Sequence, residues 1–169
     1  MVLNQTEPLA ESSPVSDPVL APITADDADE LLTVQRAAFV SEALIYGTAD
    51  MPPLTQTLEQ LRAELEDGEG WVARVDGRLV GAIRARAVDG VLMIGRIAIA
   101  PDQQGSGIGR MLLDAAESHS TAKVAELFTG SLSEANLRLY ERCGYVETSR
   151  IPQDDGIEQV FMRKQLSGQ

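Results

Sequence analysis

The stretch IAPDQQGSGIGRMLLDAAE, residues 99–117, joins an apolar strand to an amphipathic helix through three glycines. Gly105, Gly107 and Gly109 fall on alternate positions, so backbone N–H groups can converge there without side chains in the way. The helix from about Gly109 points the positive end of its dipole at the same spot. The stretch therefore predicts an anion site, or else a tight strand-to-helix turn that needs glycine only for its dihedral angles.

Two familiar glycine motifs do not fit this stretch. A P-loop needs a Lys and then a Ser or Thr after its last glycine, whereas Gly109 is followed by Arg110 and Met111. A dinucleotide-binding fingerprint has glycines at positions one, three and six in the first βαβ unit of a parallel sheet. Here they stand at one, three and five, behind residues that predict antiparallel strands, so a nucleotide-dependent enzyme is the weaker alternative.

The residues before the loop alternate with a period of two, as strands do. The runs WVARV, RLVGAIRARAV and VLMIGRIAI, between Trp71 and Ile99, are separated by Asp76-Gly77 and Asp89-Gly90. Asp-Gly is a preferred pair in two-residue hairpin turns because both positions need positive φ. We therefore expect a three-stranded antiparallel meander.

The residues after the loop predict a βαβ unit and two closing strands. A strand over 123–129 follows the loop helix and gives a parallel pair. A helix over 134–142 comes next, with Ser133 as its N-cap and Gly144 as its left-handed end. Strands over 145–150 and 157–162 flank the turn QDDG.

The first 70 residues predict a tail, an edge strand and two helices. Residues 1–18, rich in Ser, Pro and acids, are expected to be disordered, and residues 19–23 predict the strand. A helix capped by Thr24 is expected to end near Val40, with most of residues 41–57 as a loop because of Gly47, Pro52 and Pro53.

A capping box of Thr57 and Gln60 opens the second helix of this region. With the later elements, these predictions give a single domain over residues 19–165. Its class is α/β, with a mixed, mostly antiparallel sheet flanked by helices and one central parallel strand pair.

Composition excludes several function classes. The net charge is −12, and residues 1–70 hold 14 of the 26 acids but only 2 of the 14 bases. Such a chain should repel nucleic acid and anionic membranes. The sequence contains no apolar run of the roughly 20 residues that span a bilayer and no recognisable secretory signal, so we expect a cytoplasmic protein. One Cys (Cys143) and one His (His119) predict neither a disulfide nor a metal site.

The element order, together with QQGSGIG in the loop, resembles the GNAT superfamily of acyl-CoA-dependent N-acyltransferases from about Val19 to Lys164. The acyl-CoA loop of the family reads Gln or Arg, two residues, Gly, one residue, then Gly or Ala. Gln104, Gly107 and Gly109 match it position by position.

A second GNAT motif follows in the right order. It is an Asn, a Tyr four residues later and then a Gly-aromatic pair, and it appears as Asn136, Tyr140 and Gly144-Tyr145. Asn136 and Tyr140 lie on one face of the predicted helix because they are four residues apart. The two motifs together make the resemblance specific.

The resemblance implies acetyl-CoA as co-substrate and a small-molecule or peptide amine as acceptor. The pyrophosphate would bind the loop N–H groups, and the pantetheine arm would lie between strands that end at Ile99 and Thr129 and splay apart. Two catalytic roles follow, in which the Ile99 N–H polarises the thioester carbonyl and Tyr140 protonates the departing thiolate. The implied cofactor-binding residues are Ile97, Ile99, Gln104, Gly105, Ser106, Gly107, Ile108, Gly109, Arg110, Asn136 and Tyr140.

The general base stays open at this point. Many family members place a Glu on the fourth strand a few residues before the loop, but this chain has Gly95 and Arg96 there. The candidates are Glu126, Glu42, Tyr46, Asp50 and a chain of water molecules.

The acceptor and the assembly state also stay open. The acid excess in the first 70 residues favours a small cationic acceptor, since that segment covers the acceptor side in the implied fold. Dimers are frequent in the family, which leaves a homodimer open. A non-catalytic acyl-CoA-binding or sensor domain is the alternative function.

Overall fold

Seven strands form one sheet in the order β1-β2-β3-β4-β5-β7-β6. The computed structural model describes residues 16–167, so the predicted tail lies almost wholly outside the described residues. The strands are β1 (Val19–Pro22), β2 (Gly70–Val75), β3 (Arg78–Val88), β4 (Val91–Ile99), β5 (Val124–Gly130), β6 (Val146–Pro152) and β7 (Glu158–Gln165). The helices are α1 (Ala28–Tyr46), α2 (Pro52–Thr55), α3 (Leu58–Glu66), α4 (Ile108–Ser118) and α5 (Glu134–Arg142).

The predicted meander and fold class are confirmed. Strands β1 to β4 pair antiparallel in sequence order, with β1 at the edge, and β4 pairs parallel with β5. Both hairpin turns have positive φ at both central residues: 49° and 81° at Asp76 and Gly77, and 50° and 81° at Asp89 and Gly90. These are the signs that a type I′ turn requires, so the Asp-Gly pairs set the register of the meander.

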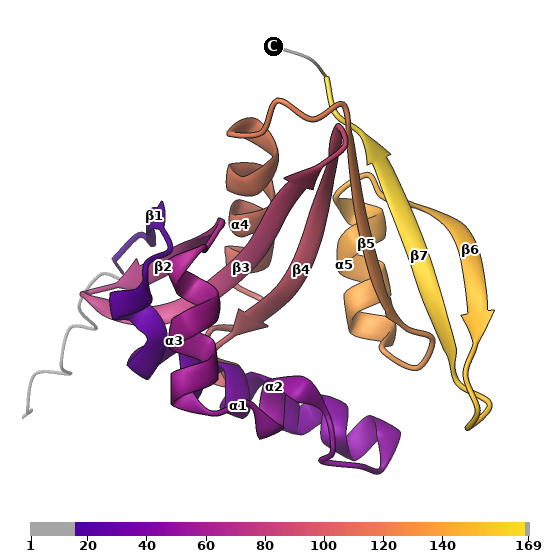
Figure 1. Cartoon of the computed structure of the whole chain (residues 1–169), viewed down its shortest axis with the longest axis horizontal. Coiled ribbons are helices and arrows are strands. Elements are labelled where there is room, and N and C mark those ends of the chain that lie inside the picture. Colours follow the sequence, from indigo (N-terminus) through magenta and orange to yellow (C-terminus); the bar gives the residue numbers. More distant parts are fainter. Residues whose placement is uncertain (1–15, 168–169) are drawn as a thin grey trace, which may run out of the picture.

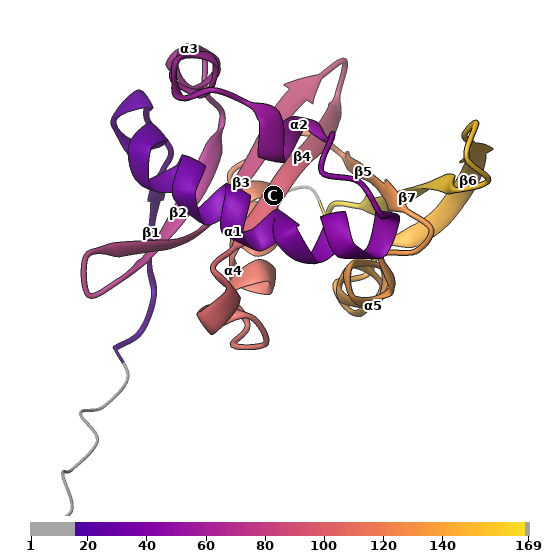
Figure 2. The same cartoon turned by 90° about the horizontal axis from the view of Figure 1, so that it is seen from below.

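Helices cover both faces of the sheet (Figure 2). Helices α1, α2 and α3 lie on one face, and α4 and α5 lie on the other. Ile83, Leu61, Leu112 and Leu113 are fully buried between these layers. The capping box of Thr57 and Gln60 is present at the start of α3, as predicted.

Strands β4 and β5 are paired over only three residues. The ladder joins Val91, Leu92 and Met93 to Val124, Ala125 and Glu126, and beyond it the two strands diverge (Figure 1). Past this point β5 stays paired with β7, and β4 with β3. The result is a gap between the ends of β4 and β5, which is the splay that the family resemblance implied.

Three local predictions are wrong. Helix α1 does not end near Val40 but continues to Tyr46, where Gly47 at φ 68° supplies the left-handed end, and α2 forms inside the segment expected to be a loop. Helix α2 begins at Pro52, directly after the extended residue Met51. Proline fits the first position of a helix because the N–H that it lacks would have no partner within the helix. Ser133 occupies the N-cap position of α5, yet its side chain makes no capping hydrogen bond.

Candidate active site

The glycine loop opens directly onto the first turn of α4. Gly105 and Gly107 have φ of 78° and 89°, a region that favours glycine, and Gly107 is the N-cap of α4. A Cβ atom added at either position would meet no other heavy atom within 4 Å. The open space beside these two glycines leaves room for a ligand next to the loop backbone, as an anion site requires.

A cavity of about 430 Å³ lies beside this loop, between α4 and α5. Arg110 and Arg142 line it and supply positive charge. Eight of the predicted cofactor-binding residues line this cavity: Ile99, Gln104, Gly105, Gly107, Ile108, Gly109, Arg110 and Asn136.

The other three predicted residues lie outside the lining of this cavity. Ser106 is exposed, and its hydroxyl donates to the carbonyl of Gln103. Ile97 lies in β4 beside the gap, and Tyr140 is buried in α5.

The backbone of β4 presents N–H groups to the gap. Ala100 donates its N–H to the carbonyl of Val80 at 2.8 Å, and hydrogen-bonded pairs alternate along an antiparallel ladder. The N–H groups of Ile97 and Ile99 therefore point away from β3, toward the side where β5 has diverged. Both are free to donate to a ligand in the gap, which is the geometry of an oxyanion site.

Tyr140 is 7% exposed and lies beside Tyr145, with ring centroids 6.2 Å apart. Burial raises the pKa of Tyr140 far above its usual range, and the nearby carboxylate of Glu42 raises that pKa further. Its hydroxyl therefore keeps its proton and is a weaker acid than a solvated tyrosine. Tyr140 is better suited to donate a hydrogen bond to sulfur than to transfer its proton fully.

Glu42 on α1 forms a cluster with the start of α5. It accepts hydrogen bonds from the Ser133 hydroxyl at 2.6 Å and from Asn136 Nδ2 at 3.3 Å, and Tyr46 is hydrogen-bonded to Ser133 at 2.6 Å. This contact explains why Ser133 does not cap α5. The last turns of α1 cross the open end of the gap and reach α5 (Figure 2). Glu42 thus joins the acceptor-side helix to a residue that lines the loop cavity.

The other two candidate carboxylates lie outside this cluster. Glu126 belongs to the paired part of β5, opposite Met93, and is bonded to Arg163. Asp50 is exposed between α1 and α2. Among the named carboxylates, Glu42 is the one that contacts residues of the predicted site.

A bulge in β4 places an arginine where many family members have a Glu. Ile83 pairs with Ile97 and Ala85 with Ile94, so Arg84 alone stands opposite two residues, Gly95 and Arg96. A bulge redirects side chains and increases twist. Arg96 donates to Gln56 Oε1 at 2.9 Å and to Gln35 Oε1 at 3.3 Å, and burial lowers its pKa from the usual arginine value.

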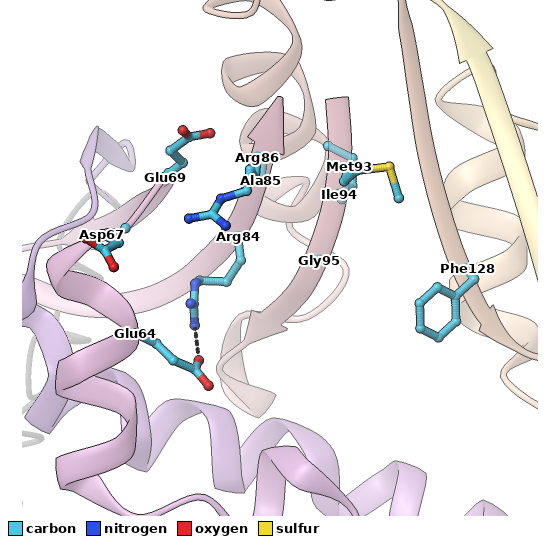
Figure 3. Close-up of a pocket in the computed structure, with 11 residues that line it drawn as sticks. Glu64, Asp67, Glu69, Arg84, Ala85, Arg86, Met93, Ile94, Gly95 and Phe128 are labelled. Atoms are coloured by element: carbon cyan, nitrogen blue, oxygen red, sulfur yellow. Dashed lines mark hydrogen bonds and ion pairs between the residues drawn. The ribbon is translucent and has the colours of Figure 1, made fainter. Parts of the chain in front are cut away.

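Two cavities lie on the face covered by α1 to α3. One, of about 520 Å³, extends from α3 across β3 and β4 to Phe128 of β5, and Arg84 in its wall is bonded to Glu64 at 3.1 Å (Figure 3). The other, of about 580 Å³, is lined by Arg96, Gln56 and Asp50, and the two share Glu64.

Sequence reasoning missed two of the side chains around Arg96. Gln35 stands at helical spacing from Leu31 and Leu32 in the first predicted helix, and a polar residue in such a position signals a buried hydrogen-bond network. Gln56 fell in the segment expected to be a loop and offered no comparable signal.

Cys143 is buried and lines the loop cavity, and burial raises the pKa of its thiol. The thiol therefore stays protonated, which makes it a poor nucleophile. Within residues 16–167, no three His, Cys, Asp or Glu side chains are grouped so that they could hold a metal ion. None of the described helices is both long and apolar enough to cross a membrane.

Comparison with known proteins identifies the family. Residues 46–166 match the acetyltransferase (GNAT) domain family. The UPF0157 protein YqkA of Bacillus subtilis is 29% identical over 131 residues, which are 77% of this chain and 38% of that protein. The chain thus spans well under half the length of this curated relative.

Solved structures show the same fold. The ribosomal-protein-S18-alanine N-acetyltransferase of Escherichia coli has a TM-score of 0.71 at 18% identity, over 90% of this chain and 96% of that one. The PaiA N-acetyltransferase of Thermoplasma acidophilum, in complex with coenzyme A, has a TM-score of 0.72 at 17% identity, over 88% and 99%. YncA of Salmonella typhimurium, with acetyl-CoA, has a TM-score of 0.72 at 20% identity, over 91% and 96%.

The match covers the two motifs, the splayed strands and the glycine loop, and it extends over most of the chain. The chain therefore belongs to the acetyltransferase (GNAT) domain family of acyl-CoA-dependent N-acyltransferases.

Proposed function

We propose that this protein transfers the acetyl group of acetyl-CoA directly to a primary amine of a small cationic molecule or a peptide. The observation that carries the proposal is that the loop cavity, the gap between β4 and β5, and the free N–H groups of β4 adjoin one another. The cavity beside the glycine loop leads to the gap between β4 and β5, and the free N–H groups of Ile97 and Ile99 point into that gap.

The co-substrate is acetyl-CoA, and its parts match the chemistry along this path. The pyrophosphate binds the N–H groups of the loop and of the start of α4, with Arg110 and Arg142 as nearby cations. The pantetheine arm lies in the gap, where unpaired backbone groups of β4 meet its amides. Asn136 lines the same cavity and is suited to bond one of them.

The thioester carbonyl binds the N–H of Ile99 or Ile97. These donors are fixed by the β3–β4 ladder, so they stabilise the developing oxyanion without reorganising. The thiolate leaves beside Tyr140. An ordinary thiol has a pKa of about 8.5 and tyrosine one of about 10. Because the pKa of Tyr140 is raised further, we assign it a hydrogen bond to the departing sulfur rather than complete proton transfer.

Glu42 is the proposed general base. An alkyl ammonium has a pKa of about 10.4, so the amine must lose a proton before its lone pair can attack. The Glu42 carboxylate attracts the ammonium ion and accepts one of its protons. The amine then attacks the thioester carbon, the C–S bond breaks, and the second proton that the nitrogen loses goes to the departing thiolate. Ser133 is bonded to Glu42 at 2.6 Å and Tyr46 to Ser133 at 2.6 Å, and this chain of hydroxyls offers a path for that proton.

The proposed acceptor enters from the face of α1 to α3, because the loop cavity lies on the opposite face. Glu42 belongs to the segment with the acid excess, which supports a cationic amine.

The test is steady-state release of free CoA from acetyl-CoA with a panel of amines of graded charge. The expected result is release that depends on the amine, with cationic members fastest. Tight binding of acetyl-CoA without amine-dependent release would instead support a non-catalytic acyl-CoA-binding domain. A thermal shift with NAD or ATP larger than that with acetyl-CoA would contradict both functions.

A further inference from the structure

Arg96 lies in the wall of the cavity of about 580 Å³ on the face of α1 to α3, and hydrogen bonds fix its position. Its Nη1 atom donates to the side-chain oxygens of Gln56 and Gln35, at 2.9 Å and 3.3 Å. Gln35 is itself fixed, because its Nε2 donates to the Pro53 carbonyl at 2.9 Å and to Gln56 at 3.1 Å. Both amides are buried. The guanidinium is therefore positioned before any ligand arrives.

The other edge of this guanidinium is free. Within residues 16–167, Nε and Nη2 of Arg96 make no hydrogen bond, and no carboxylate lies within 4.0 Å of any Arg96 nitrogen. None of the described polar side-chain atoms is both buried and without a hydrogen-bond partner, so Nε and Nη2 must be accessible. Arg96 lines the cavity of about 580 Å³, where that edge can meet a ligand.

Two acids line the same cavity, but neither is paired with Arg96. Glu64 is bonded to Arg84 at 3.1 Å, and Asp50 is exposed between α1 and α2. Arg96 is thus a charged, largely covered side chain whose only hydrogen-bond partners among the described residues are neutral amides. A charge removed from water is costly unless it is paired, and an arginine in that state is typical of a site that binds an anion.

We propose that Arg96 binds a carboxylate group of the acceptor. This inference rests on the proposed function, whose acceptor amine it describes further. The Nε and Nη2 atoms of a guanidinium present two parallel N–H groups that match the two oxygens of a carboxylate. A monoanion is favoured over a phosphate monoester, because Glu64 and Asp50 in the same wall repel a dianion more strongly.

The position of Arg96 suits such an acceptor. Along β4, Arg96 is one residue from Ile97 and three residues from Ile99. At the rise of an extended strand, these separations are about 3.4 Å and about 10 Å. An acceptor a few bonds long can therefore place its amine at the thioester and its carboxylate at Arg96. The expected class is an amino acid with an additional amine, such as lysine, which carries a carboxylate and keeps the net positive charge of the proposed acceptor.

The test uses pairs of amines that differ only by carboxylate against carboxamide: glycine and glycinamide, 4-aminobutanoate and 4-aminobutanamide, and lysine and lysine amide. Calorimetry measures their affinity for the protein saturated with CoA, so the readout does not depend on turnover. In at least one pair the carboxylate member should bind on the order of 10- to 100-fold more tightly. Equal affinities within every pair, including an absence of measurable binding, would overturn the proposal.

The variants locate the effect at Arg96. Arg96→Gln should abolish the difference within the preferred pair, and Arg96→Lys should restore only part of it because lysine lacks the two-pronged edge. The matched control is Arg150→Gln, which removes the same charge from the exposed strand β6 and should leave the ratio unchanged. A ratio that survives Arg96→Gln in a folded protein would overturn the proposal.

Two further outcomes distinguish a failure of the carboxylate assignment from a failure of the proposed acetyl transfer. A tighter-binding 3-aminopropyl phosphate than 4-aminobutanoate would overturn the carboxylate assignment. Carboxylate-selective binding without amine-dependent release of CoA would support the role of Arg96 while contradicting the proposed acetyl transfer.

Discussion

The two faces of the sheet meet at the gap between β4 and β5, and they offer different kinds of chemistry. On the face of α4 and α5, the proposed binding groups are mostly backbone N–H groups of the glycine loop, of the first helical turn and of β4. On the face of α1 to α3, they are side chains: Glu42, Arg96 and the two glutamines that hold Arg96.

This difference teaches which part of the site is generic and which is particular to this chain. Backbone donors need glycine at set positions and tolerate change elsewhere, so they serve one ligand that all members of a family share. Side-chain donors are replaceable one at a time, and in them a chain can acquire its own specificity. Substitutions on the two faces should therefore separate acetyl-CoA binding from acceptor recognition.

The largest expected effect comes from the backbone face. Gly107→Asp should weaken acetyl-CoA binding by several kcal/mol, or at least about 100-fold, because a carboxylate would stand against the pyrophosphate. The φ of 89° at Gly107 adds strain, although a Cβ atom there has open space. Calorimetry with acetyl-CoA measures the loss.

Gly156→Asp is the matched control for this substitution. Gly156 has a φ of 79° and open space around its Cβ position, but it lies in the turn between β6 and β7. The control should bind acetyl-CoA like the parent protein. An unchanged affinity in a folded Gly107→Asp protein would contradict the pyrophosphate site.

The next effect concerns the base on the side-chain face. Glu42→Gln keeps the size of the side chain and one acceptor oxygen, which can still accept from Ser133, while removing the proton acceptor and the oxygen that accepts from Asn136. Turnover should fall on the order of 100- to 1000-fold, with acetyl-CoA affinity nearly unchanged. Steady-state kinetics with saturating amine measures it.

Glu59→Gln removes an exposed carboxylate from the start of α3 and should have little effect on turnover. If Glu42→Gln turned over at the parental rate, deprotonation would have to occur through water or another residue, and the assignment of Glu42 would be wrong.

The backbone face could be predicted from the sequence to a much greater extent than the side-chain face. The Asp-Gly turns, the capping box and the alternating strands are local patterns, and each is present as expected. The loop is also local: its glycines and the helix that follows are consecutive residues.

The side-chain face depends on contacts between distant residues. Ser133 and Glu42 are 91 positions apart, and a serine before a helix ordinarily predicts a cap. Arg96 faces its cavity because β4 has an extra residue at the bulge, which no periodicity in MIGRIAI reveals. The extension of α1 to Tyr46 was missed because its residues after Val40 are half-exposed and lack a clear apolar stripe.

Tyr140→Phe tests a buried residue of α5, on the same face of the sheet as the glycine loop. The substitution keeps the ring against Tyr145 and removes the hydroxyl, so turnover should fall about 10- to 100-fold while acetyl-CoA affinity stays nearly unchanged. Equal losses in binding and in turnover would indicate a structural role instead.

The pH profile sharpens this test. The pKa of Tyr140 is raised, so its hydroxyl stays protonated as pH rises through about 10, the usual tyrosine value. The rate should therefore rise with pH as the amine acceptor deprotonates, with no loss due to Tyr140. Tyr140→Phe should lower this curve without changing its shape. A descending limb near pH 10 that disappears in Tyr140→Phe would contradict the buried, protonated tyrosine.

The smallest expected effect concerns the electric field around the acceptor face. Residues 1–70 hold 14 acids and 2 bases, and they supply α1, α2 and α3. This field should raise the association rate of cationic amines. Exposed charges are screened beyond about 10 Å at 0.1 M salt and beyond about 30 Å at 0.01 M. Raising the salt concentration across this range should lower kcat/KM for 1,5-diaminopentane a few-fold while leaving kcat unchanged.

Salt also separates the field from the contact at Arg96. The field acts at long range and is screened, whereas a carboxylate bonded to Arg96 would lie inside a cavity where screening is weaker. The preference for lysine over lysine amide should therefore persist at high salt while the advantage of cationic over neutral acceptors shrinks. If glutamate proved the best acceptor at low salt, the acid-rich helices would not steer the substrate, and acceptor choice would follow from the cavity alone.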